Sequence, residues 1–204
     1  MHDDDHEREM PDQVGRPGRR AAARSSERTS AEFALLGLIG QSPSREMHGY
    51  DLARVFGESA LGKIIRLEPG MLYHYLKKLA RDGYITTRIE SQSGRPDRQV
   101  HALTEQGESA LRAWIAAPVR STREIRLDFL IKLFLARQLE PGQAVNLVRE
   151  QQAVMQKRVA NLRRQLDDPQ PIDPTQQFGE SVLHLRLGQT ESALEWLASL
   201  PEAS

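Results

Sequence analysis

Residues 69–103 read PGMLYHYLKKLARDGYITTRIESQSGRPDRQVHAL, and this stretch decides the fold. Pro69 is favourable in the first turn of a helix, and Gly83 is a common helix-ending residue, so we expect a helix between them. Residues 84–89 then alternate like a half-buried strand, turn-forming residues 93–96 follow, and a second short apolar strand returns. The stretch therefore predicts a helix followed directly by a β-hairpin.

The expected helix has two chemically different faces. At about 100° per residue, Leu72, Leu76 and Leu79 share one face, which we expect to be buried. A helix that reads a DNA major groove needs such a buried stripe opposite a face of donors and cations. The opposite face here has that character, because its members are Gly70, His74, Lys77 and Arg81, with Lys78 at its edge.

The segments around this stretch complete a winged helix-turn-helix. Ser30 is a good N-cap for a first, strongly apolar helix. A second helix is expected at residues 47–56, with Tyr50 on its buried side, and the β-branched residues 64–67 predict a short strand. Thr104 should cap a helix after the hairpin. The order helix, helix, strand, helix, hairpin predicts a winged helix with both α and β elements.

Composition argues against several other classes of protein. The chain has 204 residues, of which 39% are hydrophobic, and no apolar run approaches the roughly 18 residues of a membrane-spanning helix. It has no cysteine, which fits a reducing compartment, so we expect a cytoplasmic protein without membrane contact. Motifs for phosphate loops, zinc proteases or nucleophile elbows are absent, so we expect no enzyme, no cofactor and no metal.

The net charge of zero conceals a basic region. Between residues 61 and 101, eight basic residues stand against four acidic ones, a net charge of +4. Arg95 and Arg98 fall at the expected tip of the hairpin, where a winged helix holds DNA phosphates. The helix and the hairpin are therefore expected to bind DNA. The basic residues are Lys63, Arg66, Lys77, Lys78, Arg81, Arg88, Arg95 and Arg98.

Within that region, we assign different contacts to different side chains. Tyr73 and His74 are expected to contact base edges, whereas Lys77 and Lys78 are expected to hold phosphates as flexible point charges. Gly70 would let the start of the helix approach the DNA backbone closely. The predicted DNA-binding set is Gly70, Tyr73, His74, Lys77, Lys78, Arg95 and Arg98.

The two ends of the chain differ from this central part. Residues 1–29 are expected to be a disordered tail, because Pro, Gly, Ser and charged residues dominate them. The tail is acidic at residues 3–12 and then rich in arginine, so it is either a solvated extension or an arm that binds phosphates or a minor groove. Residues 30–117 would form the winged helix, and residues 118–204 a separate, wholly helical part.

Several segments together resemble the PadR family of bacterial transcriptional regulators. FALLGLIGQSPSREMHGYDLARVF, residues 33–56, resembles the opening helices of the family, and EPGMLYHYLKKLARDGYI, residues 68–85, its recognition helix. GRPDRQVHALTEQGESALRAWI, residues 94–115, is similar to the wing and the following helix, and residues 126–139 to the longer branch of the family. One departure is Met71, which stands where the family often has Ser or Thr.

The resemblance implies a homodimer that places two wings on a roughly palindromic operator in double-stranded DNA, about one DNA turn apart. It also implies repression that is released by a small aromatic or xenobiotic effector. Trp114, just beyond the wing, is our candidate beside such a ligand, with a packing role as the alternative. Residues 118–204 would be the dimerisation domain, with contacts from Val148, Met155, Val159, Leu162, Leu166, Leu185 and Leu197.

Two other functions stay open. A winged helix can serve as a protein-interaction module, but such a module keeps the fold without the basic recognition face, so the basic region argues against it. A different family of winged-helix regulators is the second alternative. The long helical region after Pro118, in place of a short terminal dimerisation helix, argues against that family.

Overall fold

The computed structural model describes residues 29–92, 95–168 and 174–201, so nearly all of the predicted N-terminal tail lies outside it. The described chain is mainly helical with one small sheet, which confirms the predicted fold class. Of the described helices, none is both long enough and apolar enough to cross a membrane. The elements are α2 (Ser30–Gln41), β1 (Glu46–His48), α3 (Gly49–Glu58), α4 (Leu61–Ile64), α5 (Pro69–Arg81), β2 (Ile85–Gln92), β3 (Arg95–Leu103), α6 (Glu105–Ala116), α7 (Thr122–Glu124), a π-helical segment (Ile125–Phe129), α8 (Leu130–Leu139), α9 (Pro141–Asp167) and α10 (Pro174–Ser199).

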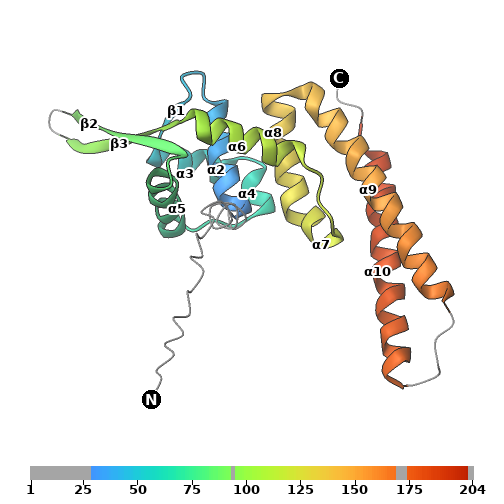
Figure 1. Ribbon diagram of the computed structural model, residues 1–204. Helices are drawn as coiled ribbons and strands as arrows, with labels where there is room; N and C mark the ends of the chain where they lie inside the picture. Colours follow the sequence, from blue (N-terminus) through green and yellow to red (C-terminus); the bar gives the residue numbers. More distant parts are fainter. Residues whose placement is uncertain (1–28, 93–94, 169–173, 202–204) are drawn as a thin grey trace, which may run out of the picture.

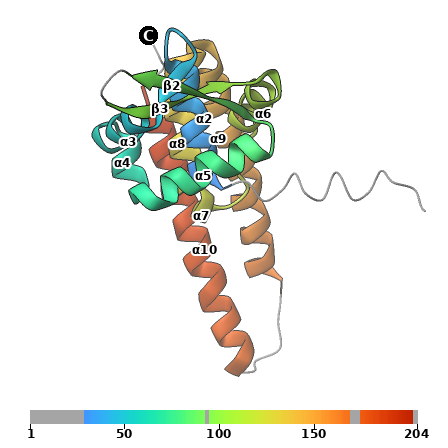
Figure 2. The ribbon, with the colours of Figure 1, turned by 90° about the vertical axis from the view of Figure 1, so that its left-hand side faces the viewer.

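Helix α5 and the β2–β3 hairpin lie on one side of the molecule, which faces the viewer in Figure 2. Helix α5 begins at Pro69, as predicted, and ends just before Gly83, whose backbone φ of 80° suits glycine. Thr104 caps α6 by accepting a hydrogen bond of 3.0 Å from the backbone N–H of Gly107, again as predicted. The sequence therefore predicts correctly where α5 begins and ends and where α6 begins.

The short strand of the sheet is not where the sequence suggested. The prediction of a strand at residues 64–67 is wrong, because Leu61–Ile64 forms the helical turn α4, and Ile65 and Leu67 after it pack against the core. Instead, Glu46–His48 forms β1, which pairs antiparallel with β3 and delays the start of the second helix to Gly49. β-propensity favours a half-buried, pleated site, but the free edge of a sheet decides which segment becomes a strand.

Helix α2 is the centre of the core. Residues 31–39 are all buried, so this helix is covered on every side. Its N-cap is Thr29 rather than the predicted Ser30, because the Thr29 side chain accepts from the N–H of Glu32 and the Glu32 carboxylate accepts from the N–H of Thr29 at 2.7 Å. Ser30 donates instead to Asp128, which connects the start of α2 to the segment before α8.

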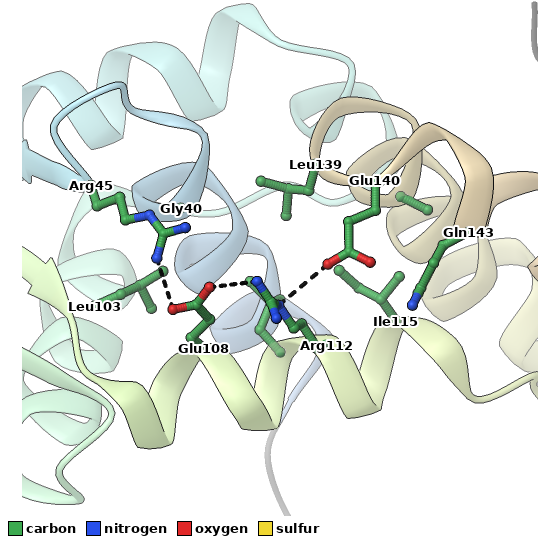
Figure 3. Close-up of a pocket in the computed structure, with 11 residues that line it drawn as sticks. Gly40, Arg45, Leu103, Glu108, Arg112, Ile115, Leu139, Glu140 and Gln143 are labelled. Atoms are coloured by element: carbon green, nitrogen blue, oxygen red, sulfur yellow. Dashed lines mark hydrogen bonds and ion pairs between the residues drawn. The ribbon is translucent and has the colours of Figure 1, made fainter.

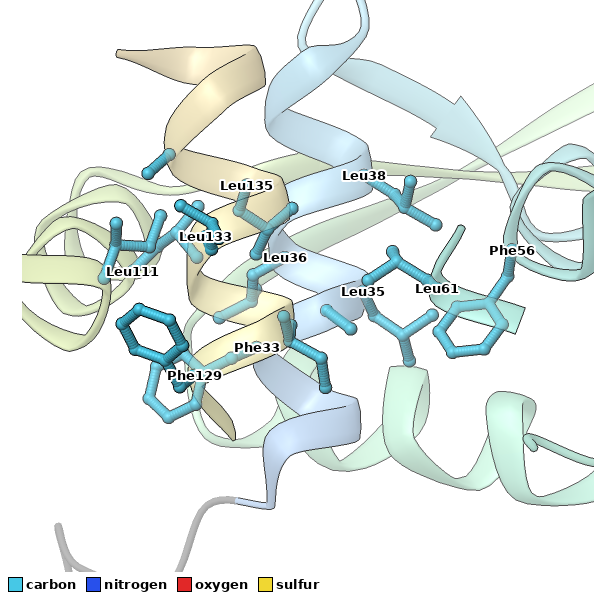
Figure 4. Packing of buried hydrophobic residues seen from close by; sticks show 14 of the residues in the cluster. Phe33, Leu35, Leu36, Leu38, Phe56, Leu61, Leu111, Phe129, Leu133 and Leu135 are labelled. Carbon is cyan, nitrogen blue, oxygen red and sulfur yellow. The ribbon is translucent and has the colours of Figure 1, made fainter. Parts of the chain in front are cut away.

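Helix α8 packs against α2 in this same core, although the sequence assigns it to the second domain (Figure 4). A Cβ added to Gly37 on α2 would lie 2.4 Å from the Cδ2 atom of Leu135 on α8, so glycine allows the close approach of the two helices. Leu35, Leu36 and Leu133 belong to the same cluster. The core is thus continuous across residue 118, and a domain division at that residue stays a prediction.

Helices α9 and α10 form a long antiparallel pair that extends away from the rest of the molecule (Figure 1). The middle of the apolar stripe predicted for α9 is buried, but the helix that covers it is α10 of the same chain. The predicted dimer residues accordingly divide by exposure: buried are Met155, Val159, Leu162 and Leu197, half-buried are Val148 and Leu166, and exposed is Leu185.

Candidate nucleic-acid interface

Helix α5 has the two faces that its sequence predicts. Leu72, Leu76 and Leu79 are each 1% exposed and anchor the helix in the core. On the other side, Tyr73 is 47% exposed, and His74 is exposed beside it. Because the apolar stripe fixes the orientation of the helix, these polar and aromatic side chains are held toward solvent.

The two neighbouring lysines of α5 have different environments. Lys77 is exposed and makes no ion pair with any described residue. Lys78 is half-buried, and its Nζ atom lies 3.0 Å from Oε1 of Glu32, a carboxylate that is completely buried at the start of α2. The ammonium of Lys78 therefore neutralises a buried charge of the protein, whereas the ammonium of Lys77 is available to a ligand.

Several other bases of the basic region are engaged locally. Arg81 binds Asp82 at 2.9 Å, and the hydrogen bond with this carboxylate, together with its charge, raises the pKa of Arg81. Arg88 on β2 binds Glu46 at 2.6 Å and also binds Glu90. The basic region therefore offers fewer unpaired cations than its net charge suggests.

The hairpin contributes Arg98 on β3, which is exposed and lies opposite Glu90 in the strand register. No ion pair joins Arg98 to a described residue within 4.0 Å. The backbone of Arg95 begins β3 opposite Gln92, while its side chain lies outside the described residues. Of the two predicted wing cations, the structure therefore places one, on the same side as α5.

A cleft of about 590 Å³ lies between the start of α3, helix α5 and β3. Tyr50, predicted to be buried, is 74% exposed here, because the buried positions of α3 are Leu52 and Phe56. Their four-residue spacing, followed around the helix, would have placed Tyr50 on another face. The cleft combines the first turn of α3, which has no side-chain cap, with two phenols, one guanidinium and two carboxylates. Its lining residues are His48, Gly49, Tyr50, Asp51, Tyr73, Asp97, Arg98 and Gln99.

Two family models match the chain in succession. The model described as the transcriptional regulator PadR-like family matches residues 35–113, and the model described as the virulence activator alpha C-terminal region matches residues 125–203. The chain belongs to the PadR family. This confirms the resemblance, and it makes the protein a DNA-binding transcriptional regulator.

Similar proteins are known from other bacteria. The negative transcriptional regulator PadR of Bacillus subtilis is 25% identical over 175 residues, and the probable transcriptional regulator Rv1176c of Mycobacterium tuberculosis is 29% identical over 185 residues. Each alignment covers 83% of this chain and 94% of the relative. The solved structure of B. subtilis PadR in complex with operator DNA covers 84% of this chain and 96% of its own, with 23% identity and a TM-score of 0.42. The complex of the same protein with p-coumaric acid has 24% identity and a TM-score of 0.39, with the same coverage.

In this PadR-family protein, Trp114 is part of a packed cluster. Its ring stacks on Phe33 with the centroids 4.4 Å apart, and the Nζ atom of Lys132 lies 4.8 Å from the centroid of the indole. Lys132 is buried and donates a hydrogen bond of 2.6 Å to the carbonyl of Ala117. Burial lowers the pKa of Lys132, against the opposing charges of Asp128 and Glu124. These contacts account for Trp114 as a packing residue.

A separate cavity of about 90 Å³ lies between α6 and the junction of α8 with α9 (Figure 3), and Trp114 is not among the residues that line it. Apolar side chains form most of its wall. Its rim is a series of ion pairs from Arg45 to Glu108 at 2.8 Å, from Glu108 to Arg112 at 2.8 Å, and from Arg112 to Glu140 at 3.3 Å. This rim connects the winged helix to the start of the C-terminal helices.

Proposed function

We propose that this protein is a homodimeric repressor that binds a roughly palindromic operator through α5 and the wing. The proposal rests on the two faces of α5. Its three leucines, each 1% exposed, fix the helix in the core, and its other face carries exposed aromatic and cationic side chains. The hairpin, with Arg98 exposed, lies on the same side of the molecule. The name of the B. subtilis relative, a negative transcriptional regulator, supports repression as the direction of control.

Within this proposal, the contacts differ in kind. Lys77 and Arg98 hold phosphates, because both are exposed cations without an ion-pair partner among the described residues. Tyr73 and His74 face the bases, and Tyr50 joins the set at the first turn of α3. Lys78 supports α5 from inside through Glu32 instead of contacting DNA directly.

The dimer is proposed to form through the outer side of α10. Phe178 is 73% exposed and Leu185 is 61% exposed, although both are large apolar side chains on a long, regular helix. Exposed apolar patches of this kind mark interaction sites, and a palindromic operator requires a second copy. The stripe of α9 contributes indirectly, because it holds α10 in place.

An effector is proposed to act at the cavity between α6 and the α8–α9 junction. At about 90 Å³ the cavity is smaller than the roughly 150 Å³ that hold a benzene ring. An aromatic ligand must therefore open the rim, and a ligand carboxylate would compete with Glu140 for Arg112. Opening the rim would break the ion pairs between the winged helix and the C-terminal helices. Ligand binding could in this way change the position of the winged helix and so its affinity for DNA.

The test is a fluorescence anisotropy titration of the full chain with the duplex upstream of its own gene, against an unrelated duplex of equal length. We expect the upstream duplex to bind at least about 10³-fold more tightly at physiological salt. A phenolic acid that enters the rim should weaken binding in the wild type and have less effect on an Arg112→Gln variant. Equal affinity for the two duplexes would contradict the proposed function.

A further inference from the structure

Two histidines meet beneath the first turn of α3. His101 on β3 is 2% exposed, and its Nδ1 atom lies 3.0 Å from Oγ1 of Thr87 on the neighbouring strand. Its Nε2 atom is buried and has no hydrogen-bond partner among the described residues, and the same is true of Nδ1 of His48. His48 lies on β1, one residue from the position paired with His101.

His101 lies beside the first residue of α3, and the same residue lies beside Tyr73 of α5. A Cβ added to Gly49, the first residue of α3, would lie 3.4 Å from Nε2 of His101 and 3.0 Å from the ring of Tyr73 on α5. Gly49 is therefore enclosed between these two side chains, and the close approach favours glycine at this position. The imidazole of His101 and the phenol ring of Tyr73 thus meet at the same glycine, at the start of α3.

The surroundings of His101 suit a neutral ring. An imidazolium has two N–H donors, and Thr87 supplies an acceptor for only one of them. Nε2 lies beside the first residue of α3. The N-terminus of a helix carries a partial positive charge, which disfavours a positive charge on the imidazole. Burial, and next the charge of His48, lower the pKa of His101.

The nearby carboxylates do not compensate such a charge. Glu46 on β1 and Glu90 on β2 both bind Arg88, and Glu90 is also 3.8 Å from Nε2 of His48. Neither carboxylate accepts a hydrogen bond from His101. The other ionisable groups that line the adjoining cleft are Tyr50 and Asp51 on α3, Tyr73 on α5, and Asp97 and Arg98 on β3 itself.

We propose that His101 is a positioning residue that holds Tyr73 and the start of α3 against the wing only while its ring is neutral, so that mild acid weakens DNA binding. The inference rests on the proposed function, because it concerns the same face of the protein. The expected direction is opposite to that of an exposed histidine next to DNA, because protonation there adds a cation and strengthens binding to phosphates.

The sign of the pH dependence follows from the direction of the shift. Because the pKa of His101 is lower in the folded chain than in the unfolded chain, its neutral form contributes full stability above the unfolded value of about 6.5. That contribution declines as the pH falls below this value toward the folded pKa. The wing and α5 should therefore separate in mildly acidic solution, before global unfolding.

The experiment measures operator affinity of the full chain by anisotropy at about pH 7.5 and about pH 5.5, at constant ionic strength. We expect the wild type to lose about fivefold or more in affinity, and His101→Asn, which keeps a polar atom near Thr87, to lose less than about twofold. His184→Gln, a change at an exposed histidine of α10, is the matched control and should behave like the wild type. A wild type that binds more tightly in acid, or a His101→Asn variant with the full acid loss, overturns the inference.

A second measurement uses the wild type alone, so it tests the inference even if the variant does not fold or the protein does not bind the operator. Histidine side-chain NMR should show His101 titrating below about pH 6.5, with the Tyr73 ring resonances shifting over the same range. A Tyr73 ring that is unchanged through the titration of His101 contradicts the positioning role, even if no operator binding is found. Absence of binding at neutral pH contradicts the proposed function instead.

Discussion

Helices α5 and α9 both carry a regular apolar stripe, yet the two stripes have different consequences. The stripe of α5, with Leu72, Leu76 and Leu79, anchors the helix in the core and leaves its other side free for a ligand. The stripe of α9, with Met155 and Val159, has the spacing of a coiled coil between two copies, but α10 of the same chain covers it. The period of a stripe shows that a face is buried, and it does not show which segment buries it.

The largest effects should come from substitutions in the α9–α10 pair. If α10 covers the stripe within one chain, Met155→Ala removes a completely buried side chain and lowers the free energy of unfolding by about 2–5 kcal/mol. Leu185→Ser, at an exposed position, should change the free energy of unfolding of the chain itself by no more than about 0.5 kcal/mol and weaken self-association. Chemical denaturation at several protein concentrations and sedimentation equilibrium measure the two quantities.

Gln156→Ala provides the control on α9, since Gln156 is exposed next to Met155. It should leave both stability and self-association unchanged. In the opposite pattern, Met155→Ala mainly dissociates a dimer and Leu185→Ser leaves it intact. That result would show that the stripe of α9 forms an interface between two copies.

An intermediate effect should separate the two lysines of α5. Lys78→Ala leaves the buried carboxylate of Glu32 without its cation, so we expect a loss of about 1–3 kcal/mol in the free energy of unfolding. Lys77→Ala should change stability by less than about 0.5 kcal/mol, but it should weaken binding to all DNA sequences and lower the slope of log affinity against log salt by about one. Thermal unfolding and anisotropy titrations over a range of salt concentrations test both expectations.

The double variant Glu32→Gln with Lys78→Met sharpens this comparison. Because it removes both members of the buried pair, it should recover most of the stability that Lys78→Ala loses. If the double variant is folded, and its salt slope is as low as that of Lys77→Ala, then Lys78 contacts phosphates after all.

The smallest effect concerns two glycines in matched positions. Gly70 and Gly142 each follow a proline at the start of a helix, and a Cβ at either would meet no atom within 4 Å. Alanine at either position should therefore raise stability slightly, by up to about 1 kcal/mol. If α5 approaches the DNA backbone closely, Gly70→Ala also weakens operator binding by roughly 1 kcal/mol, about fivefold, whereas Gly142→Ala does not. Equal operator affinities of the two variants would show that Gly70 does not lie at the DNA interface.

The winged helix was largely predictable because its signals are local. Pro69, Gly83 and Thr104 mark turns and caps through their own backbone chemistry, and three leucines define a face through their spacing alone. The strand at residues 64–67 failed for the opposite reason, since a strand exists only where a sheet edge accepts it. The roles of Lys77 and Lys78 could not be separated from sequence either, because Glu32 is far from them along the chain.

The amino-acid sequence by itself determined the order of the helices, the hairpin, the buried face of α5 and the basic character of the region around it. Each of these depends on short-range periodicity, turn chemistry and charge, which a chain carries before it folds. Only the tertiary structure decided that Glu46–His48 is the third strand, that α10 covers the stripe of α9, and that Glu32 and His101 lie behind the residues proposed to face DNA. Those facts depend on contacts between segments distant in sequence, where packing and desolvation select one partner among many that local chemistry allows.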